Sequence, residues 1–197
     1  MQGEYVRQMC ITDKLKEKGF VSTKNLSDWQ EQQLQDAVRK GEAVRLKNGI
    51  YADIDALANT MVDIRMIVPG GILCLWSAWS VYNLTTQIPN AYYIAIERTR
   101  KIVLPDYPEF QLVYQSDNLL SIGATRKNVQ GYDIPIFDME RSVCDAIKYR
   151  NKVGIDVMAE ILQTYLRRPD KNISRLMDYA SKLRIRKTLN QYLEVWQ

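Results

Sequence analysis

The chain has 197 residues and a formal net charge of +4, and its shares of hydrophobic (46%) and charged (25%) residues are ordinary for a globular protein. It has no histidine and no CxxC, P-loop, GxGxxG or GxSxG motif, which excludes histidine-based catalysis and leaves no signal for a metal or a cofactor. Three widely spaced cysteines, no apolar run long enough to cross a bilayer and no signal peptide predict a cytoplasmic protein without a membrane partner.

Residues 4–18 have helical periodicity, and they form either one helix or two if a capping pair at 12–13 starts the second. Gly19 can end this segment, because glycine readily enters the left-handed backbone conformation. The residues after it predict a short extended stretch and then a brief helix that Ser22 or Thr23 caps.

The next segment predicts a helix followed by a hairpin. Ser27 and Asp28 are each followed three residues later by Gln or Glu, so a capping box fits either start. Apolar residues at i, i+3 and i+4 then form one stripe, and Gly41 can end the helix. Asn48-Gly49 between two β-prone runs is a strong hairpin signal. A short helix followed at once by a tight hairpin is the layout of a winged helix-turn-helix, which we expect here.

A winged helix-turn-helix would place this helix in the major groove of DNA and the hairpin against the backbone. Glutamine can pair with adenine and arginine with guanine, whereas cations beside the turn suit phosphate contacts. Residues 1–53 carry nine Lys/Arg against eight Asp/Glu, so the alternatives are a winged helix that no longer binds DNA and a helical unit whose hairpin contacts only its own chain. We expect Gln32, Gln33, Gln35 and Arg39 to read bases, and Lys40, Arg45, Lys47 and Asn48 to contact phosphate.

The middle of the chain predicts a helix, a turn and a set of strands. An amphipathic helix is expected over residues 54–67, and Pro69-Gly70-Gly71 breaks it. Trp76 and Trp79 lie in an apolar segment, and we interpret them as core residues rather than as groups that stack on nucleotides. Strands are expected at residues 92–96, 110–114, 122–125 and 132–137.

Three acidic residues follow the last expected strand. Asp138 is expected to cap a helix, and Glu140 lies in its first turn, where the helix dipole favours an acid. Arg141 and Asp145 are spaced i, i+4 and are expected to form a surface ion pair. The alternative is an acid cluster of a metal-dependent nuclease. Neither Asp106 nor Asp138 is followed by the acid-x-lysine unit that restriction-type nucleases carry on a strand, so we favour the structural interpretation.

The last part of the chain predicts three amphipathic helices with a basic outer face. Residues 141–197 carry twelve Lys/Arg against six Asp/Glu. Such a face is often only solvated, but it can also touch DNA beyond the reader helix or an acidic partner protein. The expected inward-facing residues are Ile155, Met158, Ile161, Leu162 and Tyr165 in the first helix, Ile173, Leu176, Met177 and Ala180 in the second, and Ile185, Leu189, Tyr192, Leu193 and Trp196 in the third.

Several segments, in their order and spacing, resemble the AbiEi family of abortive-infection antitoxins, which belong to type IV toxin–antitoxin systems. The likeness runs roughly from Gly19 to the end of the chain. It rests on Arg45–Ala52, on Trp76-Ser77-Ala78 followed by Leu84-Thr85 and Pro89, and on Tyr93–Ile96, Tyr132–Phe137 and Asp138–Asp145. The polar signature residues after residue 53 are Ser77, Asp138, Glu140, Arg141 and Asp145.

The resemblance implies an α+β fold, with an N-terminal winged helix-turn-helix and a larger α/β antitoxin domain that has a mixed sheet and C-terminal helices. We place the two domains at residues 1–53 and 54–197. The implied function is a non-enzymatic autorepressor that binds repeats in its own promoter, as a homodimer or as paired copies. It would also counteract a nucleotidyltransferase-type toxin without a stable complex. The alternative is an antitoxin or protein-interaction module whose winged helix does not bind DNA.

Overall fold

A computed structural model describes residues 10–55, 64–105, 108–129 and 131–195. Contacts among these residues divide the chain into two compact units. Unit 1 falls within Met1–Pro69 and Val103–Tyr107, and unit 2 within Gly70–Ile102 and Pro108–Gln197. The predicted domain boundary after Asp53 stays a prediction, because residues 56–63, with most of the predicted helix over 54–67, lie outside the described residues.

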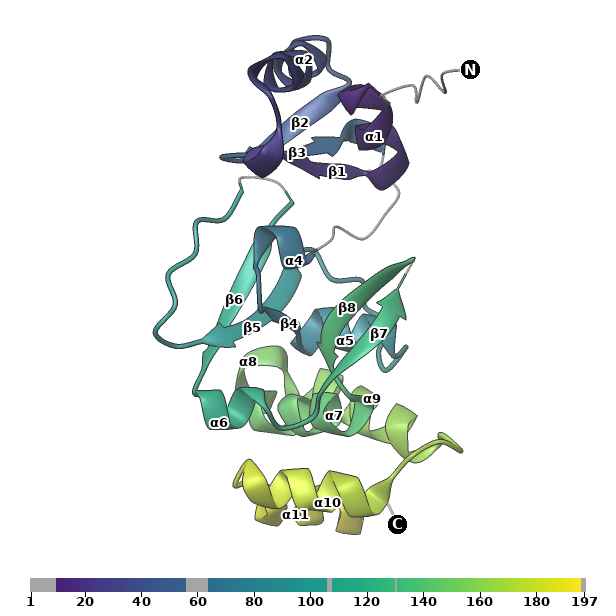
Figure 1. Cartoon of the computed structure of the whole chain (residues 1–197). Coiled ribbons are helices and arrows are strands. Elements are labelled where there is room, and N and C mark those ends of the chain that lie inside the picture. The colour runs from purple at the N-terminus through teal and green to yellow at the C-terminus, as the bar shows by residue number, and fades with distance from the viewer. Residues whose placement is uncertain (1–9, 56–63, 106–107, 130, 196–197) are drawn as a thin grey trace, which may run out of the picture. The chain divides into compact units, whose positions relative to one another are not determined.

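Unit 1 combines the helices α1 and α2 with a small antiparallel sheet, and it also includes the short helix α4 (Figure 1). Strand β3 lies between β1 and β2, so the hairpin is extended by a strand from earlier in the chain. Leu15, Leu34 and Tyr51 belong to one buried apolar cluster, which joins both helices to the sheet. The elements are α1 (Ile11–Lys18), β1 (Phe20–Ser22), a 3-10 turn η1 (Thr23–Asn25), α2 (Asp28–Arg39), β2 (Ala43–Lys47), β3 (Ile50–Asp53) and α4 (Ile64–Ile67).

The local signals around α2 are confirmed. Ser27 starts the helix, since its hydroxyl accepts a hydrogen bond from Gln30 N at 3.4 Å while Gln30 Oε1 accepts one from Ser27 N at 3.0 Å. Gly19 and Gly41 follow α1 and α2 with φ of 73° and 74°, as expected of glycine at a helix end. The hairpin turns at Asn48-Gly49 as predicted, whereas residues 4–9 of the first predicted helix lie outside the described residues.

Unit 2 contains a mixed five-stranded sheet, which confirms that part of the predicted fold. Its strand order is β6-β5-β4-β8-β7, with parallel pairs β5–β6 and β4–β8 and antiparallel pairs β4–β5 and β7–β8. The strand predicted at residues 122–125 begins two residues later, because Gly123 takes a turn conformation with φ of 71°. The strands are β4 (Ile72–Leu73), β5 (Tyr92–Glu97), β6 (Phe110–Gln115), β7 (Ala124–Val129) and β8 (Tyr132–Phe137).

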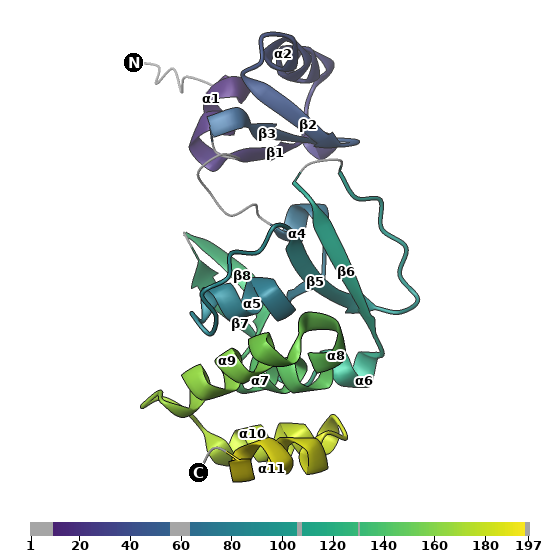
Figure 2. The ribbon, with the colours of Figure 1, turned by 180° about the vertical axis from the view of Figure 1, so that it is seen from behind.

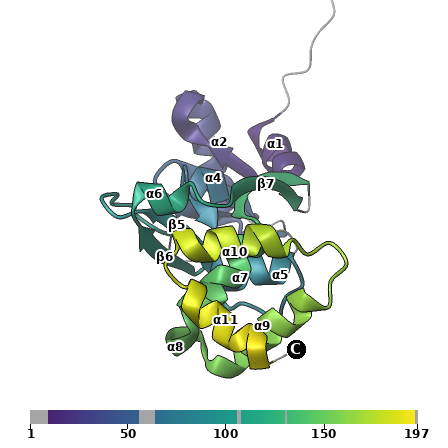
Figure 3. The same ribbon diagram turned by 90° about the horizontal axis from the view of Figure 1, so that it is seen from below.

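Helix α7 is the centre of unit 2. It contacts α5, α9, α10 and α11, and in Figures 1 and 2 it lies with α9 between the sheet and the pair α10 and α11. Seen from below, α10 runs across α7 (Figure 3). None of the described helices is long and apolar enough to cross a bilayer. The helices are α5 (Leu75–Val81), α6 (Asp117–Leu120), α7 (Met139–Lys148), α8 (Arg150–Val153), α9 (Ile155–Leu166), α10 (Ile173–Lys182) and α11 (Arg186–Val195).

Trp79 is a core residue, as predicted, and Trp76 is half-buried and packs against the core. Trp79 is fully buried, donates its indole N–H to Ser142 O at 2.9 Å and meets Trp76 edge to face at a centroid distance of 5.1 Å. Two predicted inward positions are wrong: Ile155 and Ile173 are 60% and 39% exposed. Each is the first residue of its helix, where no preceding turn exists for the side chain to cover. Trp196 lies outside the described residues.

Candidate functional site

The residues expected to contact DNA lie on α2 and on the hairpin of unit 1. Gln33 is half-buried and its Oε1 accepts a hydrogen bond from Cys10 Sγ at 3.5 Å, so it faces the N-terminal side of the unit rather than open solvent. Lys47 is in β2, but its side chain is outside the described part. Arg45 donates a hydrogen bond from Nη2 to Asn48 Oδ1 across the turn. The exposed members of the set are Gln32, Gln35, Arg39, Lys40, Arg45 and Asn48.

Acidic and apolar side chains share α2 with these residues. Arg39 Nη1 lies 3.3 Å from Asp36 Oδ1, and the two side chains are 70% and 49% exposed. An exposed pair of this kind contributes at most about 1 kcal/mol, so it restricts the Arg39 side chain only weakly. Trp29 is 67% exposed in the first turn, between Asp28 and Glu31. Helix α2 therefore presents a mixed surface rather than a basic one.

In unit 2 four of the polar signature residues, Asp138, Glu140, Arg141 and Asp145, lie on α7 or at its start, and Arg141 has the most partners. Its side chain is fully buried and over the ring of Phe137, with Cζ 4.2 Å from the centroid. The guanidinium donates to Asp145 Oδ1 at 3.0 Å and to Gln115 Oε1 at 2.8 Å. It also donates to the backbone oxygens of Leu119 at 2.6 Å and Ile122 at 2.9 Å. One cation thus ties α7 to the end of β6, to α6 and to the following loop.

The prediction that Arg141 and Asp145 form an ion pair at the surface is therefore wrong about where the pair lies. The i, i+4 pair exists, but its side chains are only 0% and 1% exposed. The reason is that α7 is covered on every side, which periodicity within one helix does not reveal. Burial raises the pKa of Asp145 despite the neighbouring guanidinium. Gln115 Nε2 and Asp145 Oδ2 are buried and have no hydrogen-bond partner among the described residues. In each side chain it is the other polar atom, Gln115 Oε1 or Asp145 Oδ1, that accepts a hydrogen bond from Arg141.

Asp138 caps α7, as predicted. Its Oδ1 accepts a hydrogen bond from Arg141 N at 2.8 Å, and its Oδ2 accepts one from Tyr179 OH at 2.9 Å. Burial raises the pKa of Asp138 above its usual value, and burial together with this hydrogen bond raises the pKa of Tyr179 to about 12. The Asp138 N–H donates to Gly123 O at 2.7 Å, which brings that glycine against the helix start.

Glu140 joins α7 to the segment between α9 and α10. It is 3% exposed, and its Oε1 accepts hydrogen bonds from Tyr165 OH at 3.2 Å and from Asn172 N at 3.1 Å. Arg175 Nη1 lies 3.8 Å from Glu140 Oε2. Burial and this carboxylate raise the pKa of Tyr165. These contacts give Glu140 a structural role. From the sequence, only a favourable interaction of Glu140 with the helix dipole was expected.

Ser77 also has a structural partner, because its buried hydroxyl accepts a hydrogen bond from Tyr93 N at 2.9 Å and so attaches α5 to β5. No group of three or more Cys, Asp or Glu side chains that could hold a metal ion occurs within the described ranges. Asp106 lies outside those ranges. Every polar signature residue of unit 2 thus has a partner that stabilises the fold.

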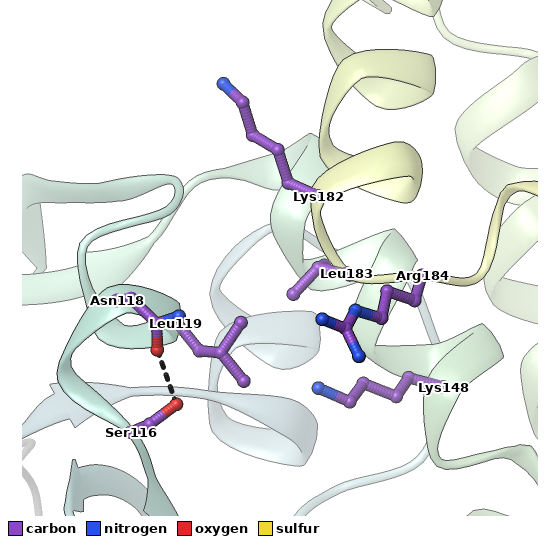
Figure 4. Close-up of a pocket in the computed structure, with 7 residues that line it drawn as sticks. All are labelled: Ser116, Asn118, Leu119, Lys148, Lys182, Leu183 and Arg184. Atoms are coloured by element: carbon purple, nitrogen blue, oxygen red, sulfur yellow. Dashed lines mark hydrogen bonds between the residues drawn. The ribbon is translucent and has the colours of Figure 1, made fainter.

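A cationic pocket of about 420 Å³ opens in unit 2 beside this network. Figure 4 shows the side chains of Lys148 and Arg184 directed into it toward Leu119, while Lys182 points away at the rim. Lys182 Nζ is 2.7 Å from Asp178 Oδ2. The side chains of Lys148 and Arg184 make no hydrogen bond or ion pair with the described residues, although the Asp145 carboxylate is close enough to affect the pKa of Lys148. No sequence pattern brings Lys148 and Arg184 together, because they are 36 positions apart in the chain. The lining residues are Ser116, Asn118, Leu119, Lys148, Lys182, Leu183 and Arg184.

A second hollow of about 450 Å³ lies along β6 in the same unit. Trp76, Tyr93, Tyr114 and Tyr149 give it aromatic walls. Lys152, its one lining cation, has Nζ 5.9 Å from the ring centroid of Tyr149. This hollow is aromatic where the first is cationic, so the two would suit different ligands.

A scan of the sequence against models of protein families found no match, and a search among curated proteins found none either. The resemblance to the AbiEi family therefore stays a prediction from the sequence.

We expect Gly123→Ala to destabilise the protein more than Gly131→Ala. Both glycines have positive φ, of 71° and 87°, so both substitutions carry a conformational cost of about 1–2 kcal/mol. A Cβ at Gly123 would lie only 2.5 Å from Arg141 Cβ, whereas one at Gly131 meets nothing within 4 Å. Displacing Arg141 from its buried partners should add about 3 kcal/mol. Urea unfolding measures both losses, and equal losses would contradict the central role of Arg141.

Tyr179→Phe should reduce the loss of stability at alkaline pH. The pKa of Tyr179 is about 12 in the folded protein against an ordinary 10.0. The folded state holds the proton more tightly, so this contribution is complete below pH 10 and disappears as the pH rises through about 12. The difference in unfolding free energy between the parent and Tyr179→Phe should shrink over this interval. A difference independent of pH would show that the hydroxyl does not depend on Asp138.

Proposed function

We propose that the protein is a DNA-binding transcriptional autorepressor and an antitoxin of a type IV toxin–antitoxin system, and that unit 1 is its winged helix-turn-helix. The observation that carries this proposal is the order of elements in unit 1. A helix, a strand, a helical turn, a longer helix and a hairpin follow one another, and the early strand completes the sheet beside the hairpin. A helix set before a hairpin in this way can enter the major groove while the hairpin reaches the backbone.

The two faces of α2 support its role as the reader. Leu34 is fully buried against α1 and the sheet, and the side chains on the other face are free to approach base edges. Gln32, Gln35 and Arg39 are the exposed long polar residues of that face. Glutamine and arginine each form two-pronged hydrogen bonds, to adenine and to guanine respectively. We assign base reading to these three residues and a supporting position to Gln33.

The hairpin suits contacts with phosphate. Arg45 and Asn48 are both exposed and already hydrogen-bonded to each other, so the turn presents a positive charge in a restricted geometry. Lys40 follows at the end of α2 and adds a second cation near the hairpin. Such contacts position the protein on the duplex without selecting a sequence, and they weaken as the salt concentration rises.

The antitoxin role rests on the AbiEi resemblance of unit 2. Its signature residues line the start of α7 and the strands and helices around it, where they hold the fold. Unit 2 would oppose a nucleotidyltransferase-type toxin through residues outside this signature. That division is reasonable, because buried residues specify a fold and exposed residues specify a partner.

One observation favours the alternative, a protein-interaction module whose winged helix does not bind DNA. Trp29 is 67% exposed at the start of α2 and has Asp28 and Glu31 in the same turn. Exposed tryptophans are common at the centres of protein interfaces, and acidic neighbours disfavour phosphate. In that case α2 would dock a protein through the same face.

Arg39→Ala and Arg45→Ala separate the two roles assigned to unit 1. Fluorescence anisotropy would follow the full chain on its own upstream DNA and on scrambled DNA across a salt series. Arg39→Ala should weaken binding to the upstream DNA about tenfold or more and reduce its preference over scrambled DNA. Arg45→Ala should weaken binding to both DNAs alike and lower the salt slope by about 1.

Lys16→Ala is the matched control, because it removes an exposed cation from α1 rather than from α2 or the hairpin. If Arg39→Ala and Arg45→Ala bind DNA like the parent, as the control variant should, the DNA interface assigned here is wrong. Two results together would favour the protein-interaction module. The parent would show no measurable DNA binding, and a double variant at Arg39 and Arg45 would still protect cells from the co-expressed toxin.

A further inference from the structure

We propose that the cationic pocket of unit 2 binds a terminal phosphate group, with Lys148 and Arg184 as its charged ligands. The pocket lies between α6, the end of α7 and the turn from α10 to α11. The proposal concerns unit 2 alone and does not depend on DNA binding by unit 1.

The first observation is the pair of cations that share the pocket. The side chains of Lys148 and Arg184 point into the same space (Figure 4), and neither has a hydrogen bond or an ion pair with the described residues. Burial lowers the pKa of Lys148 below its usual value, against the opposing effect of the Asp145 carboxylate. Arg184 is exposed, so an anion that enters the pocket from solvent can contact both cations.

The second observation is the backbone of Arg184. Arg184 N donates to Ser181 O at 3.1 Å and Ile185 N donates to Ala180 O at 2.8 Å, which together form a Schellman motif at the end of α10. Arg184 occupies the left-handed position of this motif with φ of 61°, where glycine is the usual residue. A large residue is strained there, and such strain is concentrated at functional sites. The conformation directs the guanidinium into the pocket.

The third observation is that the Arg141 network holds both walls. Arg141, Asp145 and Lys148 lie at i, i+4 and i+7 on one stripe of α7, so the stripe leads from the buried ion pair to the pocket. On the opposite wall, the guanidinium binds the backbone oxygen of Leu119 at 2.6 Å and so fixes α6. A ligand site needs supports of this kind to keep its groups in place.

The polar groups of the opposite wall suit phosphate oxygens. The Ser116 hydroxyl donates to Asn118 Oδ1 at 2.6 Å, which leaves the amide N–H groups of Asn118 as donors. A phosphate monoester carries about 1.5–2 negative charges and three acceptor oxygens, and so it matches two cations and an amide better than a carboxylate does. A phosphate inside a duplex carries only about one charge. A volume of about 420 Å³ is in the range of small-molecule sites.

Two sources can supply a phosphate monoester: a small metabolite and the 5′ end of a nucleic acid. Isothermal titration calorimetry of the full chain would use AMP, a 5′-phosphorylated oligonucleotide and the same oligonucleotide with a 5′ hydroxyl. Tighter binding of AMP would assign the pocket to a small molecule. A clear preference for the phosphorylated over the hydroxyl oligonucleotide would assign it to a nucleic-acid end.

Arg184→Gly provides the sharpest variant, because stability and binding should change in opposite directions. Glycine adopts this conformation without strain, so the Tm should rise by about 2 °C. Phosphate binding should weaken about tenfold or more, since a charge-assisted hydrogen bond is lost. Lys148→Gln should weaken binding by a similar factor. Arg167→Gln and Lys187→Gln remove exposed charges of the same types outside the pocket and should leave binding unchanged.

The proposal is overturned if no phosphate probe binds the parent chain, or if the two control variants weaken binding as much as the pocket variants do. It is equally overturned if an acidic peptide binds through Lys148 and Arg184 while AMP and the phosphorylated oligonucleotide do not. That last result would make the pocket a contact for a protein partner.

Discussion

Burying the guanidinium of Arg141 obliges unit 2 to surround a full positive charge with acceptors. A buried cation that loses its partners destabilises a protein by about 3–5 kcal/mol, so these acceptors have little freedom to move. They come from the end of β6, from α6, from the loop after it and from α7 itself. The sheet and the helical layer are consequently joined at one side chain, and the glycine at position 123 is needed because nothing larger fits beside it.

Two further polar residues at the start of α7, Asp138 and Glu140, connect this helix to other elements of unit 2. Asp138 reaches α10 through Tyr179, and Glu140 reaches the ends of α9 and α10 through Tyr165 and Asn172. Helix α7 therefore holds both α9 and α10 through hydrogen bonds as well as apolar contacts. This explains why a cluster of acids that resembles a catalytic centre in the sequence has a structural part in the fold. The same helix carries Lys148 to the cationic pocket, so fold and pocket share one support.

Unit 1 differs from unit 2 because its helices and strands are determined mainly by local sequence signals. A capping box starts α2, a left-handed glycine follows it, and an Asn-Gly turn closes the hairpin. Its surface is mixed in charge, and we propose that specificity arises from a few glutamine and arginine side chains rather than from a general attraction to DNA. In unit 2, by contrast, Leu75, Asn83 and Arg184 have positive φ although none is glycine, so local backbone preference does not determine these positions.

The sequence by itself determined the features that depend on neighbours in the chain. Helix caps, glycine ends, the hairpin, the apolar stripe of α2 and most strands of the mixed sheet were predictable, because each depends on residues within a few positions. Only the tertiary structure decided that Arg141 and Asp145 are buried, that Ile155 and Ile173 are exposed, and that Lys148 and Arg184 share a pocket. Burial depends on which elements pack around a helix, and the partners of Arg141 other than Asp145 lie 19 to 26 positions away from it. Periodicity identifies the apolar face of a helix, but it does not reveal that a second layer covers the polar face too.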